Sequence, residues 1–458
     1  MNEAFKRQIE EILPDEAEQL LQALTTEPSV AIRVNNRKTP AAPDYACVPW
    51  CDCGYYLPRR PQFTFDPLLH GGHYYVQDAS SMFIYHILRQ LADGRDVTYL
   101  DLCAAPGGKS TTALEALTDN SLVVCNEIDA GRAQILRENI IKWGYPNTVV
   151  TNDNARKLGK LKNFFDIIAA DMPCSGEGMF RKDEEAVRQW SPALVAECAE
   201  RQKEIVDDIW GALKPGGLFI YSTCTFNREE NEKMVAYIIE NYEAEPIEIA
   251  TQPEWNIHEG IDTPYPCYRF MPHRTNGEGL FVAVVRKAGE AEGGKLKPVK
   301  QKGKPAKTLP LPKGCTEMLL SSEKFTLTAT AEAVSAMPAD MAERMKQVAA
   351  AARTLHCGIP MATLKGKDLI PEHALALSTR LNREAFPFVE IDYATAIAYL
   401  RGESVTLDAD TPRGFVIVAY QGCPLGFMKH LGNRSNNNYP KEWRIRSSYL
   451  PDTPPIVI

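Results

Sequence analysis

Two cysteines follow apolar segments of this sequence that are typical of strands, and cysteine thiols can act as nucleophiles. Cys174 closes the segment ADMPC, which also contains Asp171, and Cys224 closes the segment YSTC. The carboxyl ends of parallel strands meet at one edge of a sheet, so we expect both thiols and the acid to lie there together. A lone cysteine is most often a small buried apolar residue, but two cysteines and an aspartate at one edge favour chemistry.

A pair of thiols and an acid suits methylation of carbon 5 of cytosine. That carbon is a poor nucleophile, and a thiolate that adds to carbon 6 converts the ring to an enamine, which can attack an electrophilic methyl group. Protonation of, or a hydrogen bond to, the ring nitrogen beside the exocyclic amine helps this addition and suits Asp171. A base then removes the proton from carbon 5, and a second thiol can assist release of the first. The target base must be unpaired or extruded to reach such a pocket.

The strongest local signal for a ligand is the segment LDLCAAPGGKS at residues 100–110. A strand ends there, a Pro-Gly-Gly turn follows and a helix begins. Glycines let the backbone approach a ligand closely, and the start of a helix offers free N–H groups. The segment matches neither G-x-G-x-x-G nor the Walker loop. An ordinary strand-to-helix turn is the alternative interpretation.

Acidic residues follow the next two predicted strands. Glu127 ends the second strand, where a carboxylate can accept hydrogen bonds from ribose hydroxyls. Asp129 competes for that role, but its position favours capping of the following helix. Asp153 follows the third strand and can reach the exocyclic amine of a base, or it can be a turn residue.

Strands and helices alternate from about residue 80, which predicts an α/β fold with a doubly wound, mainly parallel sheet. The predicted strands are 97–102, 121–127, 148–151, 166–170, 218–221 and 279–286. The predicted helices between them are 110–117, 130–142, 193–213 and 229–242.

The chain divides into four predicted parts: an N-terminal unit at 1–75, the strand–helix domain at 76–287, a basic linker at 288–313 and a C-terminal region at 314–458. Residues 286–313 hold nine Lys and Arg against two Asp and Glu, with several Gly and Pro, which indicates a flexible linker. In the outer parts we expect short helices over 3–24, a strand over 30–35, an irregular segment over 48–69, helices over 332–353 and 371–385, and a strand over 415–420.

Composition excludes several classes of protein. Of the 458 residues, 44% are hydrophobic and 24% charged, which is ordinary for a soluble globular chain and argues against disorder. We find no run of about 18 apolar residues, so we predict no membrane span. The beginning of the chain runs into acidic residues and lacks the apolar core of a signal peptide, so we expect a cytoplasmic protein with reduced thiols.

The net charge of −8 argues mildly against a nucleic-acid partner, but it hides an asymmetry. Residues 1–250 carry 25 basic and 38 acidic side chains, and residues 251–458 carry 26 and 21. An RNA-binding surface would therefore lie in the C-terminal half or in a local basic cleft. Cys47, Cys51 and Cys53 form the closest cysteine cluster, but no His or fourth Cys stands at zinc-like spacing, so we predict no metal.

The motifs resemble the Nol/Nop/Sun family of RNA (cytosine-5) methyltransferases. The similar segments are DLCAAPGGKS at 101–110, DMPCSGEGMF at 171–180 and YSTCTFNREENE at 221–232. The flanks are similar to one bacterial branch, the RsmF-like 16S rRNA methyltransferases. These further segments are AIRVNNRK at 31–38, VPWCDCGYYLPRRP at 48–61, GGHYYVQDASSM at 71–82, HALALSTRL at 373–381 and the run from Gly414 to Arg446. The likeness covers nearly the whole chain and is weakest in the linker.

This resemblance implies a class I, Rossmann-like methyltransferase domain that uses S-adenosylmethionine. Asp171 would lie between cofactor and target base, Cys224 would be the nucleophile, and Cys174 would assist product release. Because DNA cytosine-5 methyltransferases use the Pro-Cys thiol instead, the Thr-Cys match favours RNA. The implied cofactor-binding residues are Cys103, Ala104, Ala105, Pro106, Gly107, Gly108, Lys109, Glu127 at the ribose, Asp153 near the adenine, and Asp171.

The flanking resemblance points to 16S rRNA or the small ribosomal subunit as the partner of a monomeric enzyme. The end of the chain, from about 400 to 458, resembles a PUA-like RNA-binding domain, and its basic side chains would contact phosphates. These are Lys429, Arg434, Lys441, Arg444 and Arg446. Tyr439 and Trp443 can stack on bases or pack in a core.

Three other interpretations remain open. The motifs themselves do not separate rRNA from tRNA as the substrate. A non-catalytic RNA-binding assembly factor would have no need of both thiols. An amino-group methyltransferase needs no thiol nucleophile, and its motif usually carries an aromatic residue after the Pro, where this chain has Cys174.

Overall fold

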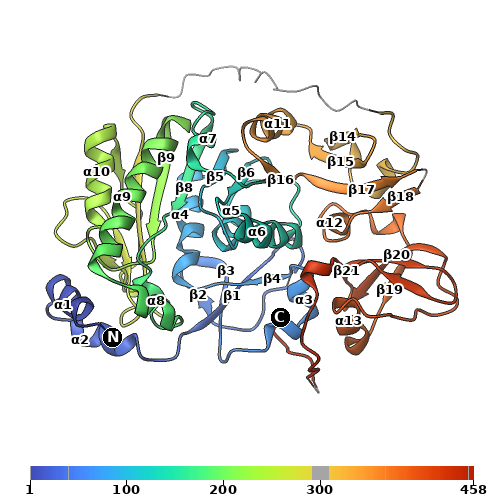
Figure 1. Cartoon of the computed structure of the whole chain (residues 1–458), viewed down its shortest axis with the longest axis horizontal. Helices are drawn as coiled ribbons and strands as arrows, with labels where there is room; N and C mark the ends of the chain where they lie inside the picture. The colour runs from blue at the N-terminus through green and yellow to red at the C-terminus, as the bar shows by residue number, and fades with distance from the viewer. Residues whose placement is uncertain (1, 40, 291–308, 367, 452) are drawn as a thin grey trace.

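The computed structural model describes residues 2–39, 41–290, 309–366, 368–451 and 453–458 (Figure 1). Most of the predicted basic linker, residues 291–308, lies outside these residues. No helix within the described ranges is both long and apolar enough to cross a membrane.

A large mixed sheet forms the centre of the molecule. Its parallel part runs in the order β9-β8-β5-β6-β7, and this order reverses direction at β5, so the sheet is doubly wound as predicted. Antiparallel strands extend one edge beyond β9, and β16 extends the other edge beyond β7. The strands are β5 Thr98–Asp101, β6 Leu122–Asn126, β7 Thr148–Thr151, β8 Phe165–Asp171, β9 Leu213–Thr223, β10 Glu245–Ile247, β11 His258–Glu259, β12 Tyr268–Phe270, β13 Leu280–Arg286 and β16 Thr354–Cys357.

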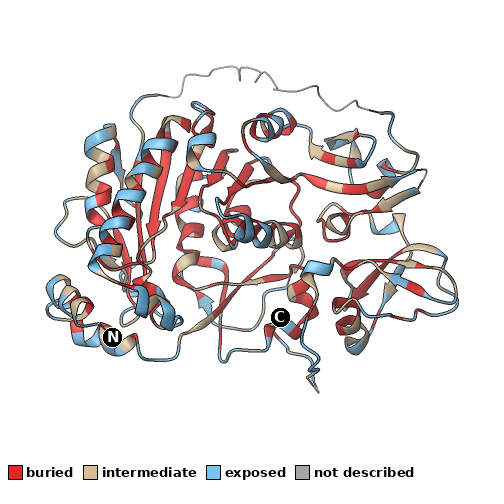
Figure 2. Ribbon diagram, viewed as in Figure 1, coloured by how far each residue is buried: buried red, intermediate tan, exposed pale blue. Residues whose placement is uncertain are grey.

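The central strands are buried along nearly their whole length because helices cover both faces of the sheet (Figure 2). Side chains of α4, α5 and α6 form the core on one face. Side chains of α9, α10 and α11 pack on the other face. The helices are α4 Phe83–Ala92, α5 Gly108–Ala116, α6 Ala130–Trp143, α7 Ala155–Leu158, α8 Glu184–Gln189, α9 Pro192–Ile209, α10 Glu232–Tyr242 and α11 Ala342–Ala351.

The N-terminal unit begins with a helical pair and continues as a small sheet of order β2-β3-β1-β4. The prediction of an irregular segment over 48–69 is wrong in part, because β3 forms near its start and α3 at its end. The alternating burial of β3 against β1 stabilises this strand despite its aromatic and Gly-containing sequence. The elements are α1 Glu3–Ile12, α2 Ala17–Ala23, β1 Val30–Val34, β2 Cys47–Val48, β3 Cys51–Leu57, α3 Pro67–His70 and β4 Tyr74–Val76.

The C-terminal region holds two four-stranded sheets, β14-β15-β17-β18 and β19-β20-β21-β22. The predicted helix over 332–353 is wrong in its first half: residues 333–338 form β15, whose alternate residues are buried against β14 and β17. The predicted helix over 371–385 reduces to α12, because Pro371 ends β18 and a turn follows Leu377. The elements are β14 Phe325–Ala329, β15 Ala333–Pro338, β17 Ile359–Lys365, β18 Asp368–Pro371, α12 His373–Ala376, β19 Phe388–Glu390, α13 Tyr393–Leu400, β20 Gly414–Tyr420, β21 Cys423–His430 and β22 Ser435–Asn437.

Two contacts join the three parts of the molecule. Strand β16, from the C-terminal region, pairs with β7 and so becomes part of the central sheet. The last sheet shares one apolar core with the N-terminal sheet, in which Ile32 and Val34 of β1 pack with Val416 and Val418 of β20. The three parts are therefore interdependent, although they are separate in the sequence.

Candidate active site

The loop after β5 has the geometry predicted for a ligand-binding turn. Gly107 adopts a φ of 112°, in the left-handed region, and a Cβ there would lie 3.3 Å from Leu136 Cδ1. Helix α5 begins at Gly108. Asp101 ends β5, accepts a 2.7 Å hydrogen bond from Ser110 Oγ, and is buried, which raises its pKa to about 7.

Beside this loop lies a cavity of about 200 Å³. It is lined on one side by the loop itself and by Asp171, and on the other side by residues 75–78 of the N-terminal unit and Ser81. The predicted cofactor-loop residues that line it are Cys103, Ala104, Ala105, Pro106, Gly108 and Lys109. Gly107 does not line the cavity, but its left-handed backbone makes the turn between the residues that do.

The carboxylate of Glu127 lies at the end of β6 and only 2% of the residue is exposed. Its Oε1 accepts a 3.0 Å hydrogen bond from Asp129 N, whereas its Oε2 is buried without a hydrogen bond among the described residues. Arg132 approaches Oε2 only to 3.7 Å. A buried, unused carboxylate oxygen is what a ribose diol would satisfy, so the residues present fit a nucleoside cofactor such as S-adenosylmethionine. Asp129 caps α6 through Arg132 N, as predicted.

Asp153 follows β7 as predicted, but its side chain has partners that the sequence did not reveal. Oδ2 accepts a 3.1 Å hydrogen bond from the backbone N–H of Arg353, and Oδ1 accepts a 3.3 Å bond from Asn154 N. Arg353 directly precedes β16, and its guanidinium also donates to Asn152 Oδ1 over 3.2 Å. The C-terminal region therefore contributes a wall beside the predicted adenine site. The only sequence signal for it would have been the strand propensity of 354–357.

The two predicted catalytic cysteines lie side by side, because β8 and β9 are parallel neighbours and each is followed by one of them. Their Sγ atoms are 3.3 Å apart. The hydrogen bond with Cys224 and burial, with the nearby charge of Glu230, raise the pKa of Cys174 well above its usual range. Cys174 therefore keeps its proton near neutral pH and can donate an S–H hydrogen bond to Cys224.

Asp171 ends β8 on the same edge. Its Oδ2 accepts a 2.8 Å bond from Lys109 Nζ, and its Oδ1 accepts a 2.9 Å bond from Ser222 Oγ. Burial by itself lowers the pKa of Lys109. The charge and hydrogen bond of Asp171, together with the charges of Asp101 and Cys224, outweigh burial, so the pKa of Lys109 is raised overall. The pair is thus an ammonium–carboxylate ion pair that joins the cofactor loop to the cysteine strands.

Two buried glutamates, which sequence reasoning missed, hold the cysteine loops together. Glu230 accepts from Ser175 N at 3.0 Å and from Asn227 Nδ2 at 2.8 Å. Glu177 accepts from Phe226 N at 2.6 Å and Asn227 N at 3.0 Å. Both glutamates connect the loop that follows Cys174 to the loop that follows Cys224, and both bond to Asn227. A buried network whose polar groups all have hydrogen-bond partners therefore sets the separation of the two thiols.

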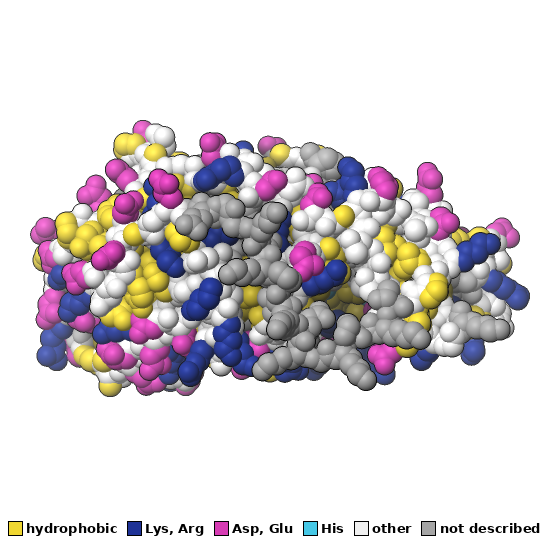
Figure 3. Space-filling view, turned by 90° about the horizontal axis from the view of Figure 1, so that it is seen from above, with side chains coloured by type: hydrophobic (Ala, Val, Ile, Leu, Met, Phe, Trp, Pro, Cys, Tyr) yellow, Lys and Arg dark blue, Asp and Glu magenta, His cyan; other side chains and the backbone are white. Residues whose placement is uncertain are grey.

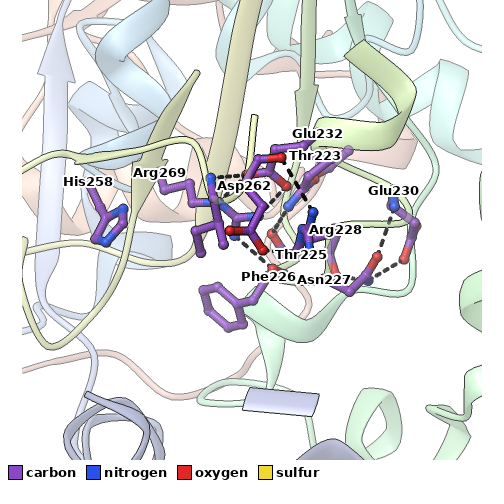
Figure 4. A network of polar contacts seen from close by, with 12 residues as sticks. Thr223, Thr225, Phe226, Asn227, Arg228, Glu230, Glu232, His258, Asp262 and Arg269 are labelled. Atoms are coloured by element: carbon purple, nitrogen blue, oxygen red, sulfur yellow. Dashed lines mark hydrogen bonds and ion pairs between the residues drawn. The ribbon is translucent and has the colours of Figure 1, made fainter. Parts of the chain in front are cut away.

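A second network supports the chain after Cys224 (Figure 4). Arg269 of β12 is 2% exposed and forms a bidentate pair with Glu232, at 2.6 and 2.5 Å. The same guanidinium donates to Phe226 O over 2.7 Å. The antiparallel strands added beyond β9 therefore anchor the loop that carries the nucleophile candidate.

The basic side chains predicted at the C-terminal end have different environments. Lys441, Arg434 and Arg446 are exposed, whereas Lys429 and Arg444 are partly buried. Tyr439 is only 2% exposed and packs against His373, so it is a core residue and does not stack on a base. On the face shown in Figure 3, acidic and basic side chains of the described residues are interspersed.

No group of three or more His, Cys, Asp or Glu side chains in the described ranges is arranged to hold a metal ion. Cys51 and Cys53 of the cysteine cluster are buried, with their Sγ atoms 3.6 Å apart, whereas Cys47 is exposed. All twelve cysteines are free of disulfides.

Comparisons with known proteins cover most of the chain. The family model for 16S rRNA methyltransferase RsmB/F matches residues 89–286. Models for the N-terminal domain of 16S rRNA methyltransferase RsmF and for the methyltransferase RsmF PUA domain match residues 1–79 and 386–445.

Curated relatives match most of this chain and most of their own length. The ribosomal RNA small subunit methyltransferase F of Aeromonas hydrophila is 32% identical over 86% of this chain and 84% of its own. That of Salmonella newport is 30% identical over 96% of each chain. A methyltransferase homolog from Pyrococcus horikoshii, at 24% identity, superposes with a TM-score of 0.53 over 63% of this chain and 95% of its own, which supports the fold. The NSun6 structure from the same organism with SFG gives 19% identity and a TM-score of 0.53 over 63% of this chain and 99% of its own.

Proposed function

Because the chain belongs to the RsmF family of S-adenosylmethionine-dependent 16S rRNA methyltransferases, we propose that it methylates carbon 5 of a cytosine in 16S rRNA by thiolate catalysis. The observation that carries this proposal is the 3.3 Å approach of Cys174 Sγ and Cys224 Sγ beside the Asp171–Lys109 pair. Neither amino-group methylation nor simple RNA binding requires two adjacent thiols on the edge where the cofactor loop lies.

The proposed roles follow from the protons that these groups hold. Cys224 adds as a thiolate to carbon 6 of an extruded cytosine, and the S–H of Cys174 stabilises that thiolate through their hydrogen bond. When S-adenosylmethionine is bound, it supplies the electrophilic methyl group for carbon 5. A proton acceptor then removes the proton from carbon 5 of the cytosine. Cys174 assists the elimination step, in which the bond between Cys224 Sγ and carbon 6 breaks.

Asp171 and Lys109 together suit the polar edge of cytosine. The Asp171 carboxylate can accept a hydrogen bond from the exocyclic amine of the cytosine. The Lys109 ammonium can donate a hydrogen bond to the neighbouring ring nitrogen. Ser222 holds the second carboxylate oxygen, so the group is oriented before the base arrives.

The cofactor assignments are part of the same proposal. The loop from Cys103 to Lys109 holds the cofactor, with Gly107 providing its turn. Glu127 accepts from the ribose hydroxyls, and Asp153 lies beside the adenine. The exposed residues Lys441, Arg434 and Arg446 contact phosphates of the rRNA.

Bisulfite sequencing of total RNA from the source cell, with and without this gene, tests reaction and substrate together. We expect one or a few protected cytosines of 16S rRNA to lose protection when the gene is absent. Loss in tRNA would keep the chemistry and replace the substrate. No change in any RNA would contradict the proposal and favour a non-catalytic assembly factor.

A further inference from the structure

We propose that a cavity of about 560 Å³, remote from the thiols, binds a backbone phosphate of the RNA substrate. This inference rests on the proposed function for the identity of the RNA. The cavity, here called the junction pocket, lies where the N-terminal unit meets the segment between α12 and β19 and the start of β21. Its polar lining residues include Arg37, Lys38, His73, Ser378, Asn382 and Arg383.

Two cations of the junction pocket lack a counter-charge. Lys38 Nζ donates to the carbonyls of Gly71, at 2.8 Å, and Lys142, at 2.6 Å, and forms no ion pair with any described residue. Arg383 donates to Gly422 O over 3.1 Å and likewise has no acidic partner in the described chain. Lys38 is half-buried, and a partly desolvated ammonium gains from a nearby anion. The geometry therefore leaves room for an anion between them.

The other charged groups around the pocket do not supply that anion. Arg37 is paired with Asp119, so that carboxylate is already engaged. Glu384 lines the rim but is exposed, where water screens its charge. His73 adds no positive charge at neutral pH, because burial, with Lys38 and Arg383 nearby, lowers its pKa to about 3. Burial also lowers the pKa of Lys38, to about 7, so its protonated form would gain from a bound phosphate.

Backbone from three distant segments is closely packed beside the pocket. A Cβ at Gly72 would lie 1.8 Å from Lys142 O, and a Cβ at Gly144 would lie 2.1 Å from Leu377 O. Thr379 N donates to Gly144 O over 3.0 Å and closes the contact. Such close approach allows only glycine at 72 and 144, and it holds Lys38 and Ser378 on a rigid frame. A rigid, positively charged hollow suits a phosphate, which is bound by fixed donors.

The junction pocket and the cofactor cavity are both lined by parts of one short segment, residues 71–78. Gly71 and His73 line the junction pocket, and residues 75–78 line the cofactor cavity. A third hollow, of about 230 Å³, is lined by other residues of the same segment, including Gly72 and Tyr74. At about 3.3 Å per extended residue, His73 and Gln77 are roughly 13 Å apart along the chain. A strand of RNA whose target base enters the active site can therefore place a neighbouring phosphate in the junction pocket.

Arg383→Ala is the main test, because this side chain is exposed and its removal leaves no buried carboxylate unpaired. Arg201→Ala is the matched control: it makes the same charge change on α9, on the other side of the molecule. Binding of a 16S rRNA fragment is measured by fluorescence anisotropy over a range of NaCl concentrations. For Arg383→Ala we expect affinity to fall about tenfold and the salt slope to decrease by about one. Affinity and slope equal to those of Arg201→Ala would overturn the proposal.

Lys38→Met tests the second cation, with thermal unfolding as a check that the variant is folded. A folded Lys38→Met variant should show the same loss of RNA affinity while titration with S-adenosylhomocysteine gives an unchanged Kd. Unchanged RNA binding by this folded variant would also contradict the proposal.

Inorganic phosphate separates the two possible sources of the anion. If millimolar phosphate raises the Tm of the wild type but not of Arg383→Ala, while RNA binding is the same for both, the pocket takes a free anion and the RNA proposal is wrong. A bisulfite experiment without any change in 16S rRNA, together with a tenfold loss of RNA affinity for Arg383→Ala, would have a different meaning. The pocket would then bind an RNA phosphate, but 16S rRNA would not be the substrate.

Discussion

Cys174 and Cys224 are 50 positions apart in the sequence, yet their sulfur atoms are 3.3 Å apart. The distance follows from the parallel pairing of β8 with β9, in which Asp171 lies opposite Ser222. Glu177, Glu230 and Asn227 then tie the two following loops to each other. The separation of the two thiols is therefore set by the register of the sheet and by a buried polar network.

Cys224→Ala should lower methyl transfer to 16S rRNA on the order of a thousandfold, because Cys224 is the thiol proposed to form the bond to carbon 6. The measurement is transfer of a radiolabelled methyl group from S-adenosylmethionine. Cys47→Ala, which changes an exposed thiol far from β9, should retain full activity. Substantial turnover by Cys224→Ala would refute its assignment as nucleophile.

Cys174→Ala should accumulate a covalent protein–RNA adduct, because bond formation at Cys224 remains possible while its release is slowed. The adduct is detected as a slower band on a denaturing gel. The double variant Cys174→Ala/Cys224→Ala should show no such band. If the single variant also shows none, Cys174 has no role in release.

Glu127→Gln should weaken binding of S-adenosylhomocysteine by about 10- to 100-fold, because hydrogen bonds from ribose hydroxyls to a charged oxygen are replaced by weaker ones. Isothermal titration calorimetry gives the Kd without any turnover. Glu138→Gln removes a carboxylate from the same stretch of chain, on α6, and should leave the Kd unchanged. Equal affinities in both variants would mean that Glu127 does not contact the ribose.

Asp101 should make the protein less stable as the pH rises. Burial raises the pKa of Asp101 to about 7 in the folded state, against an ordinary value of 3.8. Its contribution is fully present below about pH 4 and is lost as the pH rises through about 7. Asp101→Asn mimics the protonated form, so its Tm should exceed that of the wild type at pH 8 by clearly more than at pH 5.

Thermal unfolding at the two pH values checks this expectation, with Asp208→Asn as an exposed control that should follow the wild type at both. A variant Asp101→Asn that loses stability equally at both pH values would show that the carboxylate is ionised in the folded protein.

Much of the methyltransferase domain could be predicted because its strands are short, apolar and separated by capped helices. β7 has the predicted bounds, and Asp129 and Gly144 mark the ends of α6 as their types indicate. The segment 332–353 misled the prediction because its alanines favour a helix, whereas tertiary pairing of β15 with β14 and β17 decided for a strand. Sheet partners are remote in sequence, so local composition could not reveal them.

The amino-acid sequence by itself determined which residues end the strands, that Cys174, Cys224 and Asp171 share an edge, and that a glycine-rich turn precedes a helix. These features depend on local periodicity and on the common direction of parallel strands. Only the tertiary structure decided that Arg353 reaches Asp153, that Glu177 and Glu230 hold the thiols together, and that Lys38 and Arg383 face one cavity without a counter-charge. Those relationships join segments that are up to several hundred residues apart, and they exist only because long-range packing brings them into contact.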